Sequence, residues 1–178
     1  MGKYADIISK SWILGVYILI FVTLGTQDKT FERLLYAVEK EANKGILQNE
    51  EIIVQAGQTK FESQNMKIYN LLDIEVFEKF ITSCDLLITH GGVGSIIDGL
   101  KHHKKIIAAA RLYEYKEHTN DHQKQIVDNF ADEGYILKLE DFSKLDEVIK
   151  QAKNFKPKKF IFNNDHFTKK LRDYIDNN

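Results

Sequence analysis

The sequence predicts an α/β domain in which helices cover both faces of a parallel sheet. Short runs rich in β-branched and aromatic residues alternate with amphipathic segments of about ten residues, and such a helix between two strands is the crossover that a parallel sheet requires. The 178 residues suffice for one buried core of ordinary size but not for two such lobes. The predicted fold class is therefore a single Rossmann-like α/β unit.

Strands are predicted where an apolar, β-branched run ends in a turn residue. The first covers residues 18–24 and leads into Gly25, as expected for a buried central strand. The later strands are expected at residues 51–56, 66–72, 85–89, 105–110 and 135–139.

Helices are predicted where apolar residues recur at spacings of three and four. The first begins near Phe31 and runs toward Lys44, with Asp28 and Thr30 available as N-terminal caps. The later helices are expected at residues 74–83, 94–102, 120–132, 142–152 and 165–175.

Residues 1–17 are predicted to be an N-terminal extension that precedes the domain of residues 18–178. The apolar run from Trp12 to Leu24 has 13 residues, whereas a membrane-spanning helix needs roughly 20. The run ends in a glycine turn rather than in a signal-peptide cleavage site. The extension is thus an interfacial membrane anchor, a docking segment for a partner or an artefact of the chosen start codon.

The charges of the chain are balanced. Its 25 basic and 26 acidic residues give a net charge of −1, so composition provides no general attraction to nucleic acid or anionic lipid. The single cysteine, Cys84, excludes an internal disulfide and favours a cytosolic location. We expect it to be a small buried residue rather than a reactive thiol.

A glycine-rich turn follows the fourth predicted strand, and ligands of open parallel sheets bind beyond the carboxyl ends of the strands. The turn contains His90, Gly91, Gly92, Gly94 and Ser95. Glycines let the backbone approach phosphate oxygens, and the start of the next helix supplies free N–H groups and a positive dipole. His90 and Ser95 add side-chain donors, although a lone histidine in such a turn is often structural.

Two further features narrow the interpretation of this turn. Asp98 follows one helical turn later, where its carboxylate could accept hydrogen bonds from ribose hydroxyls. The turn is not a Walker loop, because no Gly-Lys-Ser/Thr sequence follows. The position of the dinucleotide fingerprint, after the first strand, holds Gly25 alone.

A second polar cluster, residues 117–123, lies before the helix expected at 120–132. Aspartate, histidine and glutamine side chains at a helix start can recognise the hydroxyls of a sugar. Alternatively, Asn120 or Asp121 caps the helix. A third alternative is zinc, since His118 and His122 are four residues apart, but the Glu of an HExxH motif is missing.

Together, THGGVGSIIDGL (residues 89–100) and EHTNDHQ (residues 117–123) resemble the C-terminal, donor-binding domain of family 28 glycosyltransferases. The small stand-alone forms of that domain are more similar still. These are the PssE-type subunits of bacterial capsule and exopolysaccharide synthesis and the catalytic subunit of the two-part eukaryotic GlcNAc transferase. IFVTLGTQDKTFERLL (residues 20–35) resembles the start of the same proteins, so the similarity runs from about residue 18 to at least residue 134.

The resemblance implies one half of a GT-B enzyme, with residues 18–178 as the nucleotide-sugar-binding domain. Residues expected at the donor diphosphate are Gly25, Thr26, His90, Gly91, Gly92, Gly94 and Ser95. Asp98 stands where the family usually has a ribose-binding glutamate. Asp121 and Gln123 match the element that contacts the donor sugar. Arg111 and Glu117 match the donor-binding strand-to-loop segment, in which alanine replaces the usual proline before the arginine.

The resemblance also implies a reaction. A hexose, hexuronate or GlcNAc would pass from a UDP-sugar to a lipid-linked saccharide acceptor in capsule or exopolysaccharide synthesis. No cofactor or metal is expected, since no DxD motif is present. Catalysis would depend on helix N-termini, backbone N–H groups and His90, which stabilise the departing UDP.

A membrane-anchored partner subunit would bind the acceptor, supply the general base and hold the chain at the cytoplasmic face of the membrane. Nucleic acid is not an expected partner. Two alternatives remain open, namely a GT-B-like nucleotide-sugar epimerase and a non-catalytic nucleotide-sugar-binding subunit.

Overall fold

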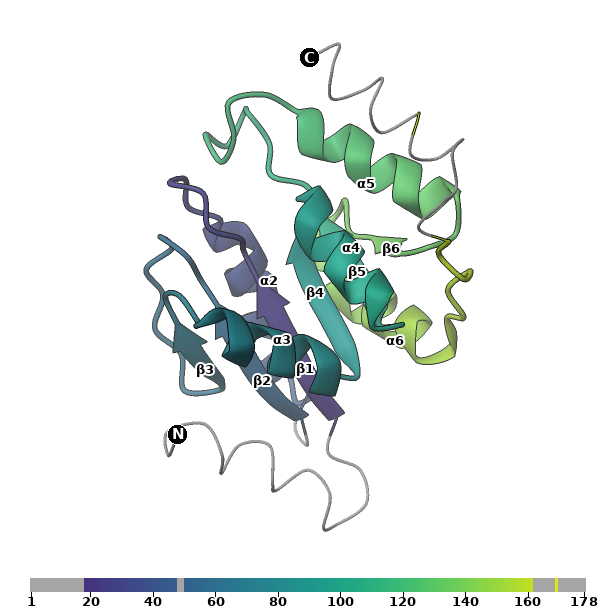
Figure 1. Cartoon of the computed structure of the whole chain (residues 1–178). Helices are drawn as coiled ribbons and strands as arrows, with labels where there is room; N and C mark the ends of the chain where they lie inside the picture. The colour runs from purple at the N-terminus through teal and green to yellow at the C-terminus, as the bar shows by residue number, and fades with distance from the viewer. Residues whose placement is uncertain (1–17, 48–49, 162–168, 170–178) are drawn as a thin grey trace.

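The computed structural model describes residues 18–47, 50–161 and 169. Its strands are β1 (Ile18–Thr23), β2 (Glu50–Gln55), β3 (Met66–Tyr69), β4 (Leu86–His90), β5 (Lys105–Ala109) and β6 (Leu137–Lys138). In this part of the chain they form one six-stranded sheet in the order β3-β2-β1-β4-β5-β6, with every pair parallel (Figure 1). This is the Rossmann order, so the predicted fold class is confirmed.

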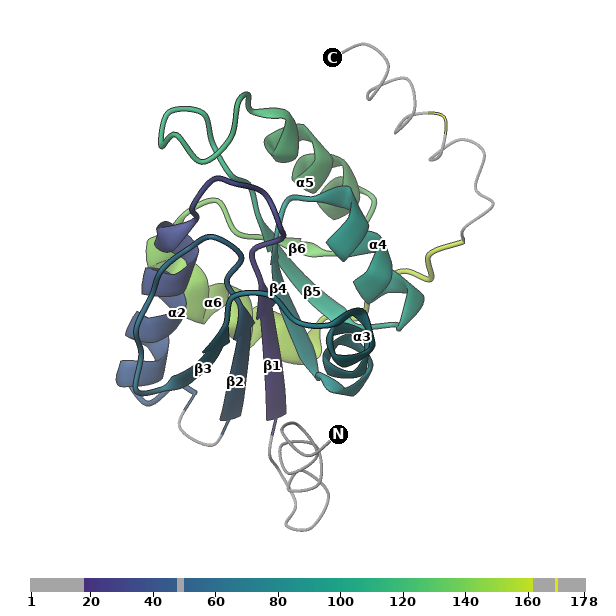
Figure 2. The same ribbon diagram turned by 60° about the vertical axis from the view of Figure 1, so that its left-hand side comes forward.

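Helices cover the sheet on both sides. They are α2 (Glu32–Asn43), α3 (Ile74–Ser83), α4 (Val93–Lys101), α5 (His122–Asp132), the short 3-10 helix η2 (Phe142–Lys144) and α6 (Leu145–Asn154). Helices α2 and α6 pack on one face, and α3, α4 and α5 pack on the other (Figure 2). The sheet is therefore the middle of three layers.

The central strand β1 shows why its sequence is continuously apolar. Ile20 and Val22 belong to the core beneath α2 and α6, whereas Leu19 and Phe21 belong to the core beneath the other three helices. Phe21 packs edge-on against Phe77, with ring centroids 5.4 Å apart. A strand buried on both faces has no polar side, so its sequence cannot alternate.

Cys84 is 1% exposed, and its Sγ donates to the carbonyl of Ile81 over 3.2 Å. Burial raises the pKa of the thiol to about 12. The prediction of a small buried cysteine is confirmed.

The predicted caps of the first helix are wrong. Helix α2 begins after Phe31, and neither Asp28 nor Thr30 caps it with a side chain. The N–H of Phe31 donates instead to the hydroxyl of Thr59, and the carbonyl of Thr30 accepts a hydrogen bond from Arg111. The segment before α2 is thus shaped by distant residues, which local capping rules do not consider.

Several predicted boundaries also differ from the structure. The third strand ends at Tyr69 rather than at Leu72, whose N–H binds the side chain of Gln55. The last predicted strand is reduced to β6, and the predicted helix at 142–152 divides into η2 and α6. The predicted extension of residues 1–17 and the helix at 165–175 lie outside the described residues.

The second half of the apolar run at residues 12–24 is strand β1, as predicted. Considering only the part of the chain that the structure describes, no helix has the length and apolar character needed to cross a bilayer.

Candidate functional site

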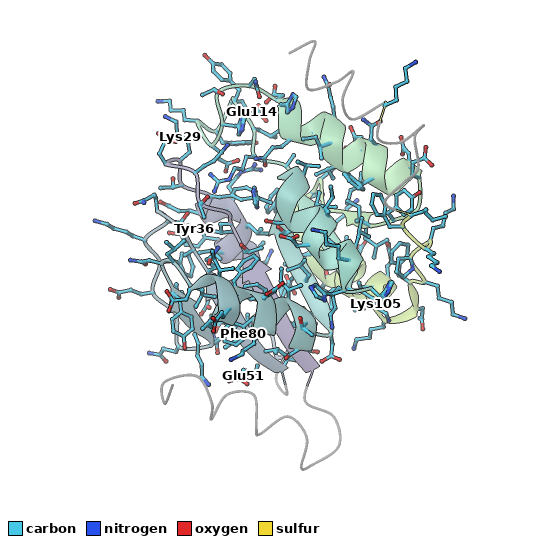
Figure 3. All side chains as sticks on the ribbon, in the orientation of Figure 1. Lys29, Tyr36, Glu51, Phe80, Lys105 and Glu114 are labelled. Carbon is cyan, nitrogen blue, oxygen red and sulfur yellow. The ribbon has the colours of Figure 1, made fainter. Side chains whose placement is uncertain are left out.

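The candidate site lies where the sheet changes its winding direction. Strands β1 and β4 are neighbours, yet α2 follows β1 onto one face and α4 follows β4 onto the other. Loops that leave neighbouring strands in opposite directions create a crevice at the carboxyl edge of the sheet. Lys29 of the β1–α2 loop and Glu114 of the β5–α5 loop lie at this end of the molecule, and Glu51 near the start of β2 lies at the other (Figure 3).

His90, the last residue of β4, is packed between two glycine turns and is 7% exposed. A Cβ atom at Gly25 would lie 2.6 Å from the ring Nε2, and one at Gly92 would lie 2.2 Å from the same atom. At Gly57, whose φ is +60°, a Cβ atom would lie 2.6 Å from the carbonyl oxygen of Gly25. The sequence analysis did not include Gly57 in the site, because its role depends on a contact with a distant turn.

The imidazole of His90 is uncharged at neutral pH. Burial, reinforced by the nearby charge of Arg111, lowers its pKa to about 4. Its Nδ1 lies 3.4 Å from the hydroxyl oxygen of Thr89. A neutral ring can donate one hydrogen bond to an anion, but it cannot contribute a full positive charge.

The start of α4 offers positive charge from its backbone rather than from a side chain. The helix begins at Val93, and Gly92 precedes it in an extended conformation without a side-chain cap. The first N–H groups of a helix lack intrahelical acceptors and form the positive end of its dipole. Gly94 is exposed, and a Cβ atom there would meet no other atom within 4 Å. This helix terminus is therefore open to an anion.

Three other predicted residues are Thr26 in the β1–α2 loop and Ser95 and Asp98 in α4. Thr26 is exposed directly after Gly25, and Ser95 is half-buried in the first turn of α4. Asp98 follows one turn later and pairs with Lys101, with Nζ and Oδ1 3.3 Å apart. Ser95 and Asp98 thus belong to the first two turns of α4, and their roles at a donor, like that of Thr26, stay predictions.

The start of α5 packs directly against the glycine turn. A Cβ atom at Gly91 would lie 2.8 Å from the Cβ of Gln123, so only glycine permits this approach. Gln123 is buried, and its Oε1 accepts a hydrogen bond from the backbone N–H of Arg111 over 3.2 Å. Asp121 accepts from the N–H of Tyr113, whereas Asn120 accepts from the N–H at the start of α5. Asp121 occupies the N-cap position of α5, but the side chain that binds an N–H at the helix start is that of Asn120.

Arg111 holds the β1–α2 loop. Arg111 is 1% exposed, and its guanidinium donates to the carbonyls of Leu24 at 2.6 Å, Lys29 at 2.7 Å and Thr30 at 3.3 Å. Burial lowers its pKa to about 10, against the opposing effect of Glu117, so it remains charged at neutral pH. Because these partners are backbone carbonyls, Arg111 fixes the conformation of the loop that borders the crevice. A direct contact of Arg111 with a donor stays a prediction.

Glu117 forms a bidentate ion pair with Arg33 of α2, with N–O distances of 2.7 and 2.6 Å. The sequence analysis missed Arg33, since nothing in its local pattern distinguishes it from a surface arginine of an amphipathic helix. Its guanidinium lies 3.9 Å from the ring centroid of Tyr115 and 4.4 Å from that of Phe142. The pair joins α2 to the β5–α5 loop.

The zinc alternative gains no support. His118 lies 3.2 Å from the side-chain amide of Gln27, and its Nδ1 accepts from the N–H of Asn120. Among the residues that the structure describes, no group of three or more His, Cys, Asp or Glu side chains could hold a metal ion.

Solved structures share this fold. The crystal structure of the glycotransferase of kitacinnamycin matches with a TM-score of 0.61 at 16% identity, over 79% of this chain and 36% of that protein. The solution structure of ALG13 matches with a TM-score of 0.56 at 18% identity, over 87% and 94% of the two chains. The prediction of a Rossmann-like half of a GT-B glycosyltransferase is confirmed at the level of fold.

Sequence comparisons define the family. The UDP-N-acetylglucosamine transferase subunit ALG13 of Candida glabrata is 42% identical over 55 residues, which are 30% of this chain and 25% of that protein. The model of the glycosyltransferase family 28 C-terminal domain matches residues 19–177. Because that match covers most of the chain, the protein belongs to the family of glycosyltransferase family 28 C-terminal domains.

Proposed function

We propose that this chain is the UDP-sugar-binding, catalytic subunit of a two-component glycosyltransferase. One observation carries the proposal, namely the uncapped N-terminus of α4 directly after the His90–Gly92 turn, at the switch point of the sheet. Such a terminus is suited to a diphosphate, because free N–H groups and the helix dipole act together on an anion. The family assignment supports sugar transfer as the reaction.

In the proposed mechanism, the diphosphate lies between the start of α4 and the turn at Gly25. Negative charge grows on the UDP as its bond to the sugar breaks, and backbone N–H groups already oriented toward it stabilise that charge. His90 acts as a neutral donor, Thr26 and Ser95 supply hydroxyl groups, and Asp98 binds the ribose. The protein itself performs the work that a metal ion performs in other transferases.

The transferred sugar, a hexose, hexuronate or GlcNAc, is proposed to lie at the start of α5. Asp121 and Gln123 are the residues proposed to contact its hydroxyls. One oxygen of each side chain already binds a backbone N–H, which fixes the orientation of the remaining polar atoms. A side chain oriented in advance loses less entropy when it binds a ligand.

A second subunit is proposed to complete the enzyme. The curated relative is itself named a subunit, which supports a two-chain assembly. We propose that a membrane-anchored partner binds a lipid-linked saccharide, supplies the general base and brings this chain to the cytoplasmic face of the membrane. Capsule or exopolysaccharide synthesis is the proposed setting.

A non-catalytic role in nucleotide-sugar binding is the second candidate. It is favoured by the low pKa of His90, about 4, which makes this residue a weak base and leaves the chain dependent on a general base from elsewhere. An unaided epimerase is the third possibility, and the transfer experiment separates all three.

Binding is tested first, by calorimetric titration of the purified chain with UDP, UDP-glucose, UDP-galactose, UDP-GlcNAc and UDP-glucuronate. Transfer is then assayed in membranes that contain the chain with a candidate partner. We expect binding by the chain alone and transfer only with the partner. Binding without transfer in any combination would favour the non-catalytic role, and epimerisation by the chain alone would favour the epimerase.

A further inference from the structure

The loop between β5 and α5, residues 110–121, leads into the proposed sugar-binding element. It contacts α2, a helix that lies across the crevice from α5. The contact is the ion pair between Arg33 and Glu117, residues that are 84 positions apart in the sequence. Neither the fold comparison nor the family resemblance gives Arg33 a role.

The surroundings of this pair make it a strong and directional contact. The side chain of Glu117 is 6% exposed and that of Arg33 is 26% exposed, so water and salt screen the two charges less than on an open surface. Two parallel N–H···O bonds also fix the relative orientation of the groups. The rings of Tyr115 and Phe142 lie against the guanidinium and add cation–π attraction.

Further hydrogen bonds connect Glu117 to other residues of the loop. Its Oε2 accepts from the N–H of Leu112, and its carbonyl accepts from the guanidinium of Arg111. Tyr113, which follows Leu112, donates its N–H to Asp121. Glu117 and Asp121 thus bind the N–H groups of two adjacent residues, Leu112 and Tyr113. A displacement of Glu117 is therefore expected to move Asp121 as well.

We propose that Arg33 is a positioning residue for the donor sugar. It holds Glu117, and through Glu117 the loop, so that Asp121 and Gln123 face the sugar of the bound donor. This inference rests on the proposed function and adds to it a residue that touches neither UDP nor sugar. Because the diphosphate site is built from the β1 and β4 turns, loss of Arg33 should affect recognition of the sugar far more than binding of UDP.

The test compares affinities for UDP and for UDP-sugars by calorimetric titration of the full chain. The probes are UDP, UDP-GlcNAc and UDP-glucose. Arg33→Met keeps an apolar stem against the two rings but removes the charge, and Arg33→Lys restores a charge without the bidentate geometry. Lys150→Met removes the cation of an exposed ion pair in α6 and serves as the control.

We expect Arg33→Met to raise the ratio of the UDP-sugar Kd to the UDP Kd by about tenfold, with the UDP Kd changed by less than about twofold. Arg33→Lys should recover part of the loss, and Lys150→Met should leave the ratio unchanged. Glu117→Gln should match Arg33→Met, and the double variant should lose no more than either single variant, as expected for residues that act as one unit.

Amide hydrogen exchange gives a second measurement that needs no ligand. In Arg33→Met, peptides from residues 112–121 should exchange faster, and peptides from residues 86–100 should keep their wild-type rates. Equal losses of UDP and UDP-sugar affinity, or unchanged exchange in the loop, would overturn the role of Arg33 and leave the proposed function intact. A wild-type chain that binds none of the three probes would instead refute the proposed function.

Discussion

Gly25 and Gly92 flank the imidazole of His90 in the candidate site, and Gly57 lies against the carbonyl of Gly25. A Cβ atom at any of these positions would overlap the imidazole or a backbone carbonyl. The site is thus lined by main chain at the places where a diphosphate is proposed to lie. Gly94 differs from them, because a Cβ atom there would have open space around it.

This difference predicts opposite behaviour for two single-methyl substitutions. Gly92→Ala should lower the free energy of unfolding by about 1–3 kcal/mol, because the new methyl group overlaps the ring of His90. Gly94→Ala should leave stability unchanged or raise it by up to about 1 kcal/mol, since alanine favours a helix. Both should weaken UDP binding. Urea denaturation and calorimetry measure the two effects, and full UDP affinity in Gly94→Ala would place the diphosphate elsewhere.

The buried imidazole of His90 leads to a second prediction, which concerns the pH dependence of stability. Its folded-state pKa of about 4 lies below the ordinary histidine pKa of 6.5, so the unfolded chain binds the proton first as pH falls. The contribution of the neutral ring to the free energy of unfolding is fully present above pH 6.5 and is lost as the pH falls toward 4. The total change in this free energy is about 3 kcal/mol. Denaturation between these pH values should show a weaker pH dependence in His90→Asn than in the wild type.

The exposed His103 provides the matched control. Its φ of 54° is a conformation that asparagine tolerates well, so His103→Asn should fold normally. We expect it to keep the wild-type pH dependence. An identical slope in the wild type and His90→Asn would show that the ring is not buried in its neutral form.

At the scale of elements, the features that could be predicted from the sequence are those that a local pattern of residues determines. The period of the apolar residues located α3 and β4, and the order of strands and helices implied a parallel sheet. The glycine turn after β4 was identified because backbone contact with phosphate requires residues without side chains. These features depend on neighbours in sequence, which is why they could be predicted.

Contacts between distant segments could not be predicted in the same way. The start of α2 depends on the hydroxyl of Thr59 and on the guanidinium of Arg111, rather than on a cap from Asp28 or Thr30. Arg33 has no local signature, because its partner is 84 residues away. The direction of each loop is set by these long-range partners, so only a three-dimensional structure reveals it.

The β1–α2 loop provides a prediction at this scale. Arg111→Lys should lower the free energy of unfolding by about 2–4 kcal/mol, because one ammonium group cannot reach the carbonyls of Leu24 and Lys29 with the geometry of a guanidinium. Lys124→Met, which removes exposed ion pairs with Asp128 and Glu140, should change the free energy of unfolding by less than about 1 kcal/mol. Urea denaturation of both variants provides the comparison, and equal effects would argue against a structural role for Arg111.

At the scale of the whole molecule, the chain spans 36% of the kitacinnamycin glycotransferase and 94% of the ALG13 chain solved in solution. It therefore has the extent of one lobe, and a GT-B site lies between two. The proposed partner subunit would supply the other wall of the crevice.

The assembled enzyme should work without a divalent metal, because backbone donors and a helix terminus are proposed to stabilise the departing UDP. Sugar transfer by membranes that contain both subunits should persist in excess EDTA, with less than about a twofold change in rate. A complete loss that magnesium or manganese restores would rule out this mechanism. A metal-dependent transferase assayed in the same buffer shows that the chelator is effective.

The central position of β1 has a consequence for synthesis of the chain. Strand β1 emerges from the ribosome first among the described strands, but it must pair with both β2 and β4, and β4 begins 63 residues after β1 ends. Until β4 is made, one edge of β1 has no partner, and its side chains are among the most apolar of the chain. Unpaired apolar edges promote aggregation, and the pairing of distant parallel strands is slow. Nascent chains that stall before β4 should therefore depend on chaperones more than chains that stall after it.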